Sequence, residues 1–222
     1  MSAKIIVSYD GTANEEDAIA LGRLLGQAGA EVSIAYVTHG HDSVGDTQNL
    51  LNRGIELLGN PNAKGHVVNS PSTPEGLATL AESEGADVIV FCSDSHTANG
   101  HVSIGNSAQR LLSGGRTAVA IAPVGLAERA TSIRQVVAVG DNDGGAADTA
   151  AALLKAAGGE VSPVANEQTD LVIVDSRGEA EAGRVSLSSS AEHLIEVSSS
   201  AVLVLPRGAR LQFGAQQFVA QP

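Results

Sequence analysis

Short, continuous apolar runs alternate with longer segments of helical periodicity along the N-terminal part of the chain. The runs predict strands that are buried on both faces, at 4–10, 31–37, 65–69, 87–92 and 117–122. Between them, apolar residues three or four positions apart predict helices at 14–28, 47–59, 74–84 and 108–112. Short loops between alternating strands and helices are typical of a parallel sheet with helices on both faces. We therefore expect an α/β fold with a doubly wound, mostly parallel sheet.

A shortened version of the same order follows in the C-terminal part. Strands are expected at 135–141, 160–165, 169–175 and 201–206, and helices at 145–157 and 188–195. Only residues 166–168 join the second and third of these strands, so this copy lacks the middle helix, strand and helix of the first. We interpret the chain as a tandem repeat. It has a complete domain at 1–127, a truncated domain at 132–207 and a tail at 208–222.

The truncated copy has to cover apolar surface and a sheet edge that it cannot bury alone. The first copy is the expected partner, through the strands at 117–122 and 201–206, which gives an intrachain pseudo-dimer. The tail carries Phe213 and Phe218, and we expect it to pack on this body. Whether the pseudo-dimer forms a homodimer is open at this point.

Composition narrows the class of protein. Hydrophobic residues make up 43% of the 222 residues but aromatic residues only 2%, so Val, Ile, Leu and Ala must fill the core. The formal net charge of −12 opposes binding to nucleic acid or to an anionic membrane surface. We see neither an apolar run long enough to span a bilayer nor a secretion signal, and therefore expect a cytoplasmic protein. Cys92 is the single cysteine, so no intramolecular disulfide can form.

A polar loop at 93–104, rich in Ser, Gly, Asn and Thr, follows the predicted strand at 87–92. Gly105, Asn106 and Ser107 then open a helix, and Asn106 or Ser107 is able to cap it. Glycine and small polar residues at a helix N-terminus after a parallel strand suit an anion. This segment is the first candidate for a binding site.

Two segments resemble the universal stress protein family. The first is IIVSYDGT, from Ile5 to Thr12, which resembles the opening strand and acidic turn of that family. The second is GNSAQRLLSGGRTAVAIAPVGLAE, which begins at Gly105 and resembles the last helix and strand. The two motifs frame Lys4 to Val124 at a family-like separation. The resemblance implies a stress-response or signalling module of that fold, in which the last strands commonly pair across a dimer.

The resemblance also implies a site for an adenine nucleotide in the first copy, with Mg²⁺ if the ligand is ATP or another triphosphate. Nucleotide-binding members have a pattern of Gly, two residues, Gly, nine residues, then Gly-Ser or Gly-Thr. The matching positions here are Cys92, Ser95, Gly105 and Asn106, followed by Ser107, so one of the three glycines is kept. Ser95 can replace glycine only if its φ is ordinary. Asp94 opposes a phosphate by like charge.

At the other end of the implied site, Asp10 resembles the family acid that contacts adenine or ribose, with Gly11, Thr12 and Val37 at neighbouring positions. Each has a structural alternative: Asp10 and Thr12 as helix caps, and Val37 as a core residue. In the second copy, the positions that align with the pattern are Asp141, Gly178, Ser188 and Ser189. We do not expect nucleotide binding there, because the missing middle segment removes a wall of the pocket.

Other polar clusters give weaker signals. His39, His41, Asp42 and Asp46 carry metal-binding groups, but their spacing fixes no ligand geometry, and a solvated loop is the favoured interpretation. His96 and His101 flank the polar loop and are interpreted as surface residues. Cys92 follows a buried strand and is interpreted as a small core residue.

Three functional hypotheses remain. The favoured one is a stress-response or signalling module that binds an adenine nucleotide, with at most slow, incidental ATP hydrolysis, since no base or water-positioning residue can be named. The second is an interaction protein of the same fold that has lost the ligand. The third is an α/β enzyme, a phosphotransferase or flavoprotein, which is disfavoured because the sequence has neither a Walker A nor a G-x-G-x-x-G motif.

Overall fold

The computed structural model describes residues 1–12, 14–40, 44–129, 131–140, 144–166 and 168–214. The strands are β1 Lys4–Ser8, β2 Glu31–Thr38, β3 Gly65–Asn69, β4 Val88–Cys92, β5 Ala118–Ala122, β6 Gln135–Val139, β7 Glu160–Val161, β8 Leu171–Asp175 and β9 Ala201–Leu205. The helices are α1 Glu15–Gln27, α2 Val44–Leu58, α3 Thr73–Glu84, α4 Asn106–Leu112, α5 Leu126–Arg129, α6 Gly145–Ala157 and α7 Ser189–Glu196.

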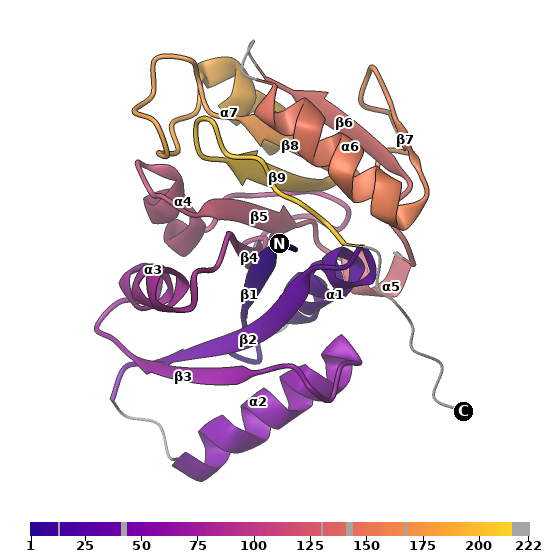
Figure 1. The fold of residues 1–222 in the computed structure, drawn as a ribbon. Coiled ribbons are helices and arrows are strands. Elements are labelled where there is room, and N and C mark those ends of the chain that lie inside the picture. Colours follow the sequence, from indigo (N-terminus) through magenta and orange to yellow (C-terminus); the bar gives the residue numbers. More distant parts are fainter. Residues whose placement is uncertain (13, 41–43, 130, 141–143, 167, 215–222) are drawn as a thin grey trace.

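One nine-stranded sheet runs through the molecule in the order β3-β2-β1-β4-β5-β9-β8-β6-β7 (Figure 1). Every neighbouring pair is parallel except β5 and β9, which are antiparallel with Ala120 opposite Leu203. The predicted doubly wound, mostly parallel α/β sheet is confirmed. The strand pair expected to join the two parts of the chain is the antiparallel one.

Helices cover both faces of the sheet because successive strand residues point to opposite sides. Ile5 and Val7 of β1 belong to one buried cluster together with apolar residues of α1, α2, α5 and α6. Ile6 belongs to a second cluster with apolar residues of α3, α4 and α7. Both clusters extend from the N-terminal strands to β8 and β9, so each helical layer continues across the β5–β9 junction.

Three differences from the sequence prediction exceed two residues or add an element. β7 has two residues instead of the predicted 160–165, and Val161 and Val164 are 50% and 67% exposed, so this edge offers nothing to bury them. The short helix α5 was not predicted, since four residues carry no helical period. The helix expected at 47–59 begins three residues earlier, at Val44.

The segment after β9 crosses back to the start of β1. The Ala3 amide donates to the carbonyl oxygen of Gln212 at 2.7 Å. Leu211 is buried, and Phe213 packs against the first cluster. Packing of the tail, as expected, therefore holds as far as residue 214, whereas Phe218 lies outside the described residues. None of the helices in the described ranges has the length and apolar character needed to cross a membrane.

Candidate functional site

The strand order places a switch point between β1 and β4. The chain proceeds from β1 outward to β2 and β3 on one side, and through β4 and β5 on the other. In open α/β sheets, ligands bind beyond the carboxyl ends of the strands at such a point. The loops that follow β1 and β4 meet there, because the Asn14 side-chain amide donates to the Asp94 carbonyl oxygen at 3.2 Å. Asp10, Thr12 and Ser95 lie on these loops, at the same edge of the sheet.

The turn after β1 is closed by carboxylates of its own. Asp10 Oδ1 accepts from the Thr12 amide at 2.9 Å, and Glu15 Oε2 accepts from the amides of Asp10 and Gly11. The residue that precedes α1 is Asn14, and its side chain makes no capping hydrogen bond. The capping alternative for Asp10 and Thr12 is therefore wrong. Asp10 closes the turn, and Glu15 accepts from the backbone amides of Asp10 and Gly11, which lie before the helix.

Glu15 is the most perturbed acid at this edge. Its side chain is buried, with 6% of the residue exposed. Burial, and after it the negative charge of Asp10, raise the pKa of the Glu15 carboxyl to about 8. At neutral pH Glu15 is thus mainly protonated, and Asp10, which is exposed, carries the negative charge of the turn. No sequence pattern distinguishes Glu15 from Glu16, because both are acidic residues in the first turn of α1.

The loop after β4 is organised by one buried serine. Ser93 Oγ donates to the Ala122 carbonyl oxygen at 2.7 Å and accepts from the Ser103 amide at 3.1 Å. Ser103 Oγ in turn accepts from the Asp94 amide at 3.1 Å. These bonds fix both ends of the loop on the sheet, so its polar tip is held by the fold rather than by a ligand.

Ser95 and Asp94 are both exposed on this loop. No described residue other than glycine has a positive φ, so Ser95 meets the condition set for it as a replacement for glycine. Asp94 Oδ1 accepts from the His96 amide at 3.0 Å, and its negative charge stays at the position where a phosphate would approach.

Gly105 is the N-cap residue of α4, with φ −68° and ψ 161°. It makes no side-chain capping bond, so the expected cap by Asn106 or Ser107 is wrong; these residues are the first two of the helix itself. A Cβ at Gly105 would meet nothing within 4 Å. The space in front of this helix end is therefore open, as an approaching anion requires, although the backbone there does not need glycine.

Val37 and Cys92 lie near the ends of β2 and β4, where the loops begin. Val37 is 8% exposed and belongs to the cluster under α3, as its structural alternative expected. Cys92 is half-buried, and burial together with the charges of Glu15 and Asp10 raises the pKa of its thiol to about 12. The thiol stays protonated at physiological pH, which agrees with a small core residue and not with a nucleophile.

In the second copy, Asp175 stands where Cys92 stands in the first. A Cβ on Gly140 would lie 2.3 Å from Asp175 Oδ2, and one on Gly145 would lie 2.8 Å from Asp175 Oδ1. This carboxylate therefore fills the space between the strand ends. Asp141 lies outside the described residues. Ser188 is the N-cap of α7 and accepts from the Ala191 amide at 3.2 Å.

The other polar side chains singled out in the sequence follow β2 and β4. Within the described ranges, no group of three or more His, Cys, Asp or Glu side chains could hold a metal ion. His39 Nδ1 lies 2.9 Å from the Ser70 carbonyl oxygen, while His41 and Asp42 are outside the described residues. His96 and His101 are exposed.

A cavity that the sequence did not predict lies elsewhere, between α4 and the loop that joins β8 to α7. Its volume is about 610 Å³, and Arg177, Arg184 and Glu192 line it. None of the residues predicted for nucleotide binding lines it. One signal was available in the sequence: Arg177 occupies the position that Asp94 occupies in the first copy, directly after the last strand residue and a serine.

Comparison with known proteins bears on the fold. No protein-family model matches the sequence, and no curated protein matches it. The structure is similar to a universal stress protein from Archaeoglobus fulgidus DSM 4304, with a TM-score of 0.69 and 14% identity over 94% of this chain and 100% of that one. A protein of unknown function from Pseudomonas aeruginosa PAO1 is similar with a TM-score of 0.64 and 12% identity, over 94% of each chain. The chain thus has the fold of universal stress proteins, as its motifs predicted.

Proposed function

We propose that the protein is a stress-response or signalling module of the universal stress type that binds an adenine nucleotide at the edge formed by the loops after β1 and β4. The observation that carries the proposal is the meeting of these two polar loops at the switch point of the sheet, tied by the Asn14–Asp94 hydrogen bond. The adenosine end would lie against Asp10, Gly11 and Thr12, and the phosphates against Ser95 and Gly105.

The open space at Gly105 and the ordinary φ of Ser95 support the phosphate end of this proposal. Asn106 and Ser107 would donate from the first turn of α4. Asp94 requires that a triphosphate arrive with Mg²⁺, which would bridge the two negative groups. The tandem arrangement, with 1–127 and 132–207 as its two copies, belongs to the same proposal, as do a cytoplasmic location and the option of a homodimer.

A second candidate, an interaction protein of this fold without a ligand, is favoured by one specific observation. Glu15 already accepts from the amides of Asp10 and Gly11, which are the donors that the turn after β1 would offer to a ligand. The exposed carboxylates of Asp10 and Asp94 make this edge acidic as well. In that case the surface of the module, and not the pocket, would carry the function.

Isothermal titration with ATP, ADP and AMP, with and without Mg²⁺, separates the two candidates. Saturable binding near one site per chain, lost in Asp10→Ala, is the expected result. The melting temperature of that variant should stay close to that of the parent, because Asp10 is exposed and its carboxylate closes only a local turn. Absence of both heat and a thermal shift at millimolar nucleotide would favour the interaction protein.

A further inference from the structure

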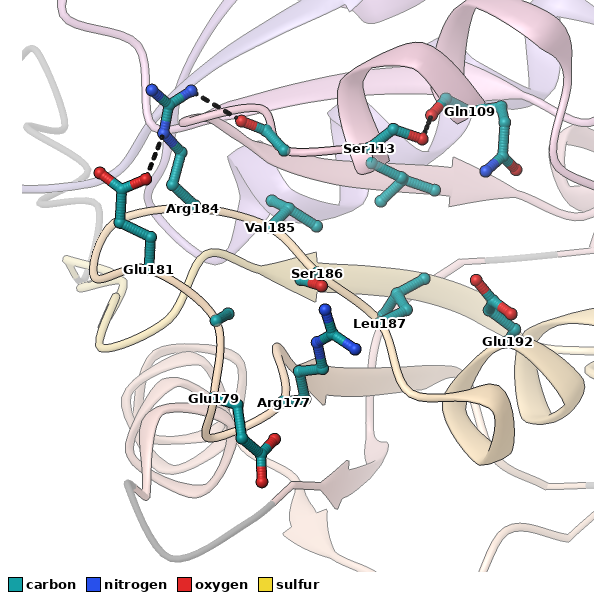
Figure 2. Close-up of a pocket in the computed structure, with 13 residues that line it drawn as sticks. Gln109, Ser113, Arg177, Glu179, Glu181, Arg184, Val185, Ser186, Leu187 and Glu192 are labelled. Atoms are coloured by element: carbon teal, nitrogen blue, oxygen red, sulfur yellow. Dashed lines mark hydrogen bonds and ion pairs between the residues drawn. The ribbon is translucent and has the colours of Figure 1, made fainter.

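The cavity between α4 and the β8–α7 loop has the size of a small-molecule site. We call it the α4–α7 cavity; its lining includes Gln109 of α4, Ser113 directly after α4, Arg177, Arg184 and Ser186 of the loop, and Glu192 of α7 (Figure 2). Its volume of about 610 Å³ lies within the range of pockets that hold small organic ligands. Its wall is mostly polar, so the ligand it suits is polar as well.

The wall of the cavity is held in place by the backbone. Val185 and the turn after α4 exchange hydrogen bonds: the Val185 amide donates to the Gly115 carbonyl oxygen at 2.8 Å, and the Gly114 amide donates to the Val185 carbonyl oxygen at 3.0 Å. Arg184 Nη1 adds a bond to the Gly114 carbonyl oxygen at 2.8 Å. The two sides of the cavity therefore keep a fixed distance, which reduces the entropy lost when a ligand binds.

Some charged side chains around the cavity form an ion pair with each other, and others do not. Arg184 Nε lies 3.7 Å from Glu181 Oε2, and this pair of a half-buried arginine and an exposed glutamate forms the rim (Figure 2). Glu179 points away from α4, whereas Arg177 points into the space below it (Figure 2). Within the part of the chain that the structure describes, the Arg177 guanidinium makes neither an ion pair nor a side-chain hydrogen bond. Arg177 and, across the cavity, Glu192 are thus the charges left for a ligand.

The fold alone does not require an arginine at this position. Asp94 occupies the equivalent place in the loop after β4, next to the serine that anchors that loop in the same manner. The framework accepts either charge, so Arg177 is free to serve a partner. A guanidinium offers two parallel N–H donors that match a carboxylate or phosphate.

We propose that the α4–α7 cavity binds a small hydroxylated oxyanion, with the anionic group on Arg177 and hydroxyl groups donating to Glu192. A sugar phosphate and a sugar acid share this chemistry. The Glu192 carboxylate, on the far side of the cavity from Arg177, would repel a second anionic group, so the site excludes ligands with two such groups. This site is independent of the nucleotide site proposed at β1 and β4.

Titration of the full chain followed by ¹H–¹⁵N NMR tests the proposal, with ribose 5-phosphate and gluconate as probes and ribose as the neutral control. Saturable shifts of the Arg177, Gly178 and Ser186 amides with one or both anions, and none with ribose, are expected. The two probes distinguish a phosphate from a carboxylate as the preferred group. Asp10→Ala should bind these probes as the parent does, so failure of the nucleotide proposal leaves the result intact.

Three variants locate the site. Arg177→Ala should weaken binding at least about tenfold, the usual loss for a charge-assisted hydrogen bond. The affinity of Arg177→Lys should lie between those of Arg177→Ala and the parent, because lysine keeps the positive charge but lacks the two parallel N–H donors. Arg110→Ala is the matched control, since it removes an exposed arginine of α4 that does not line the cavity. Glu192→Gln should weaken ribose 5-phosphate more than inorganic phosphate.

Several results would overturn the proposal. Equal losses of affinity in Arg177→Ala and Arg110→Ala would mean that binding depends only on the net charge of the protein. Inorganic phosphate binding as tightly as ribose 5-phosphate would reduce the cavity to an unspecific anion contact. Absence of shifts at these amides with all probes at 10 mM, a concentration about tenfold above a millimolar dissociation constant, would exclude the site.

Discussion

Ser93 and Ser176 make the same two hydrogen bonds in two different loops. Each hydroxyl donates at 2.7 Å to the carbonyl oxygen 29 positions further along the chain, that of Ala122 or Leu205. Each also accepts at 3.1 Å from the amide 10 positions further along, that of Ser103 or Ser186. Both serines are buried, with 2% and 4% of the residue exposed. The two loops thus have a common frame, although their other side chains differ.

The two loops also reach across to each other's half of the molecule. The Val102 amide donates to the Ser198 carbonyl oxygen at 3.1 Å, in the turn before β9. The Val185 amide donates to the Gly115 carbonyl oxygen at 2.8 Å, in the turn before β5. Such reciprocal contacts are what a two-fold interface between copies produces. They support the proposed pseudo-dimer.

Replacement of either serine should therefore destabilise the protein to a similar degree. In Ser93→Ala and Ser176→Ala, the amide of Ser103 or Ser186 loses its acceptor, and a loss of about 1–3 kcal/mol in the free energy of unfolding is expected. Urea denaturation measures it. Ser95→Ala, in the exposed part of the first loop, is the control and should change stability by less than about 0.5 kcal/mol. Losses no larger than that of the control would contradict the shared frame.

The stability of the protein should fall as the pH rises from about 4.5 to about 8, because of Glu15. The folded state holds the Glu15 proton up to a pKa of about 8, whereas the unfolded chain releases it near the ordinary glutamate pKa of 4.5. Within that window the folded state binds more protons, so the free energy of unfolding decreases by about 1.4 kcal/mol per pH unit from this group. The stabilisation of the folded state by the Glu15 proton is therefore fully present below pH 4.5 and lost above pH 8.

Glu15→Gln should remove this slope, since the amide oxygen can still accept from Asp10 and Gly11 but carries no titratable proton. Denaturation curves at a series of pH values, compared with the parent, give the difference directly. The exposed Glu56 of α2 provides a control variant, Glu56→Gln, in which the slope should persist. Parallel pH profiles for the parent and Glu15→Gln would show that Glu15 ionises normally.

The order of strands and helices was predictable because each buried strand is a continuous apolar run. Ile5 to Val7 and Val119 to Ile121, for example, are all nearly inaccessible to solvent. The pairing of β5 with β9 followed from the need to cover the shortened copy. The extent of β7 did not follow, because Val161 and Val164 look like strand residues but lie at an edge where no layer covers them.

The candidate site was predicted less completely, since local motifs do not reveal side-chain burial. Asp10 was found from its motif, but the buried acid beneath it, Glu15, is placed by the packing of α1. The N-cap of α4 was predicted at Asn106 or Ser107, but the helix begins at Asn106, so Gly105 is the N-cap residue. The α4–α7 cavity joins Arg177 to a helix far away in the sequence, so no local pattern could indicate it.

The two glycines that flank α4 should lose different amounts of stability when replaced by alanine. At Gly115 a Cβ would lie 2.2 Å from the Leu111 carbonyl oxygen, so Gly115→Ala must displace backbone and should lower stability by about 1–3 kcal/mol. At Gly105 a Cβ meets nothing within 4 Å, and Gly105→Ala should lose at most about 1 kcal/mol as a poorer N-cap. Thermal and urea unfolding provide both values.

Nucleotide titration of Gly105→Ala extends this comparison to the proposed site. The added methyl group would occupy the open space through which a phosphate approaches the start of α4, so nucleotide affinity should fall although the fold is kept. A variant that is equally stable and binds nucleotide as the parent does would place the phosphates elsewhere.

A chain cut after residue 127 should associate through β5. All five residues of that strand are buried, and its outer edge pairs with β9 in the full chain. Without β9 this edge exposes unpaired amides and carbonyls beside apolar side chains, which is a strong template for pairing with a second strand. Because β5 already pairs in antiparallel fashion, two such fragments can pair symmetrically, β5 with β5. Sedimentation velocity at tens of micromolar protein should show a dimer for the fragment. A stable, folded monomer would mean that β5 does not need a partner strand, and the proposed division into two copies that cover each other would lose its physical basis.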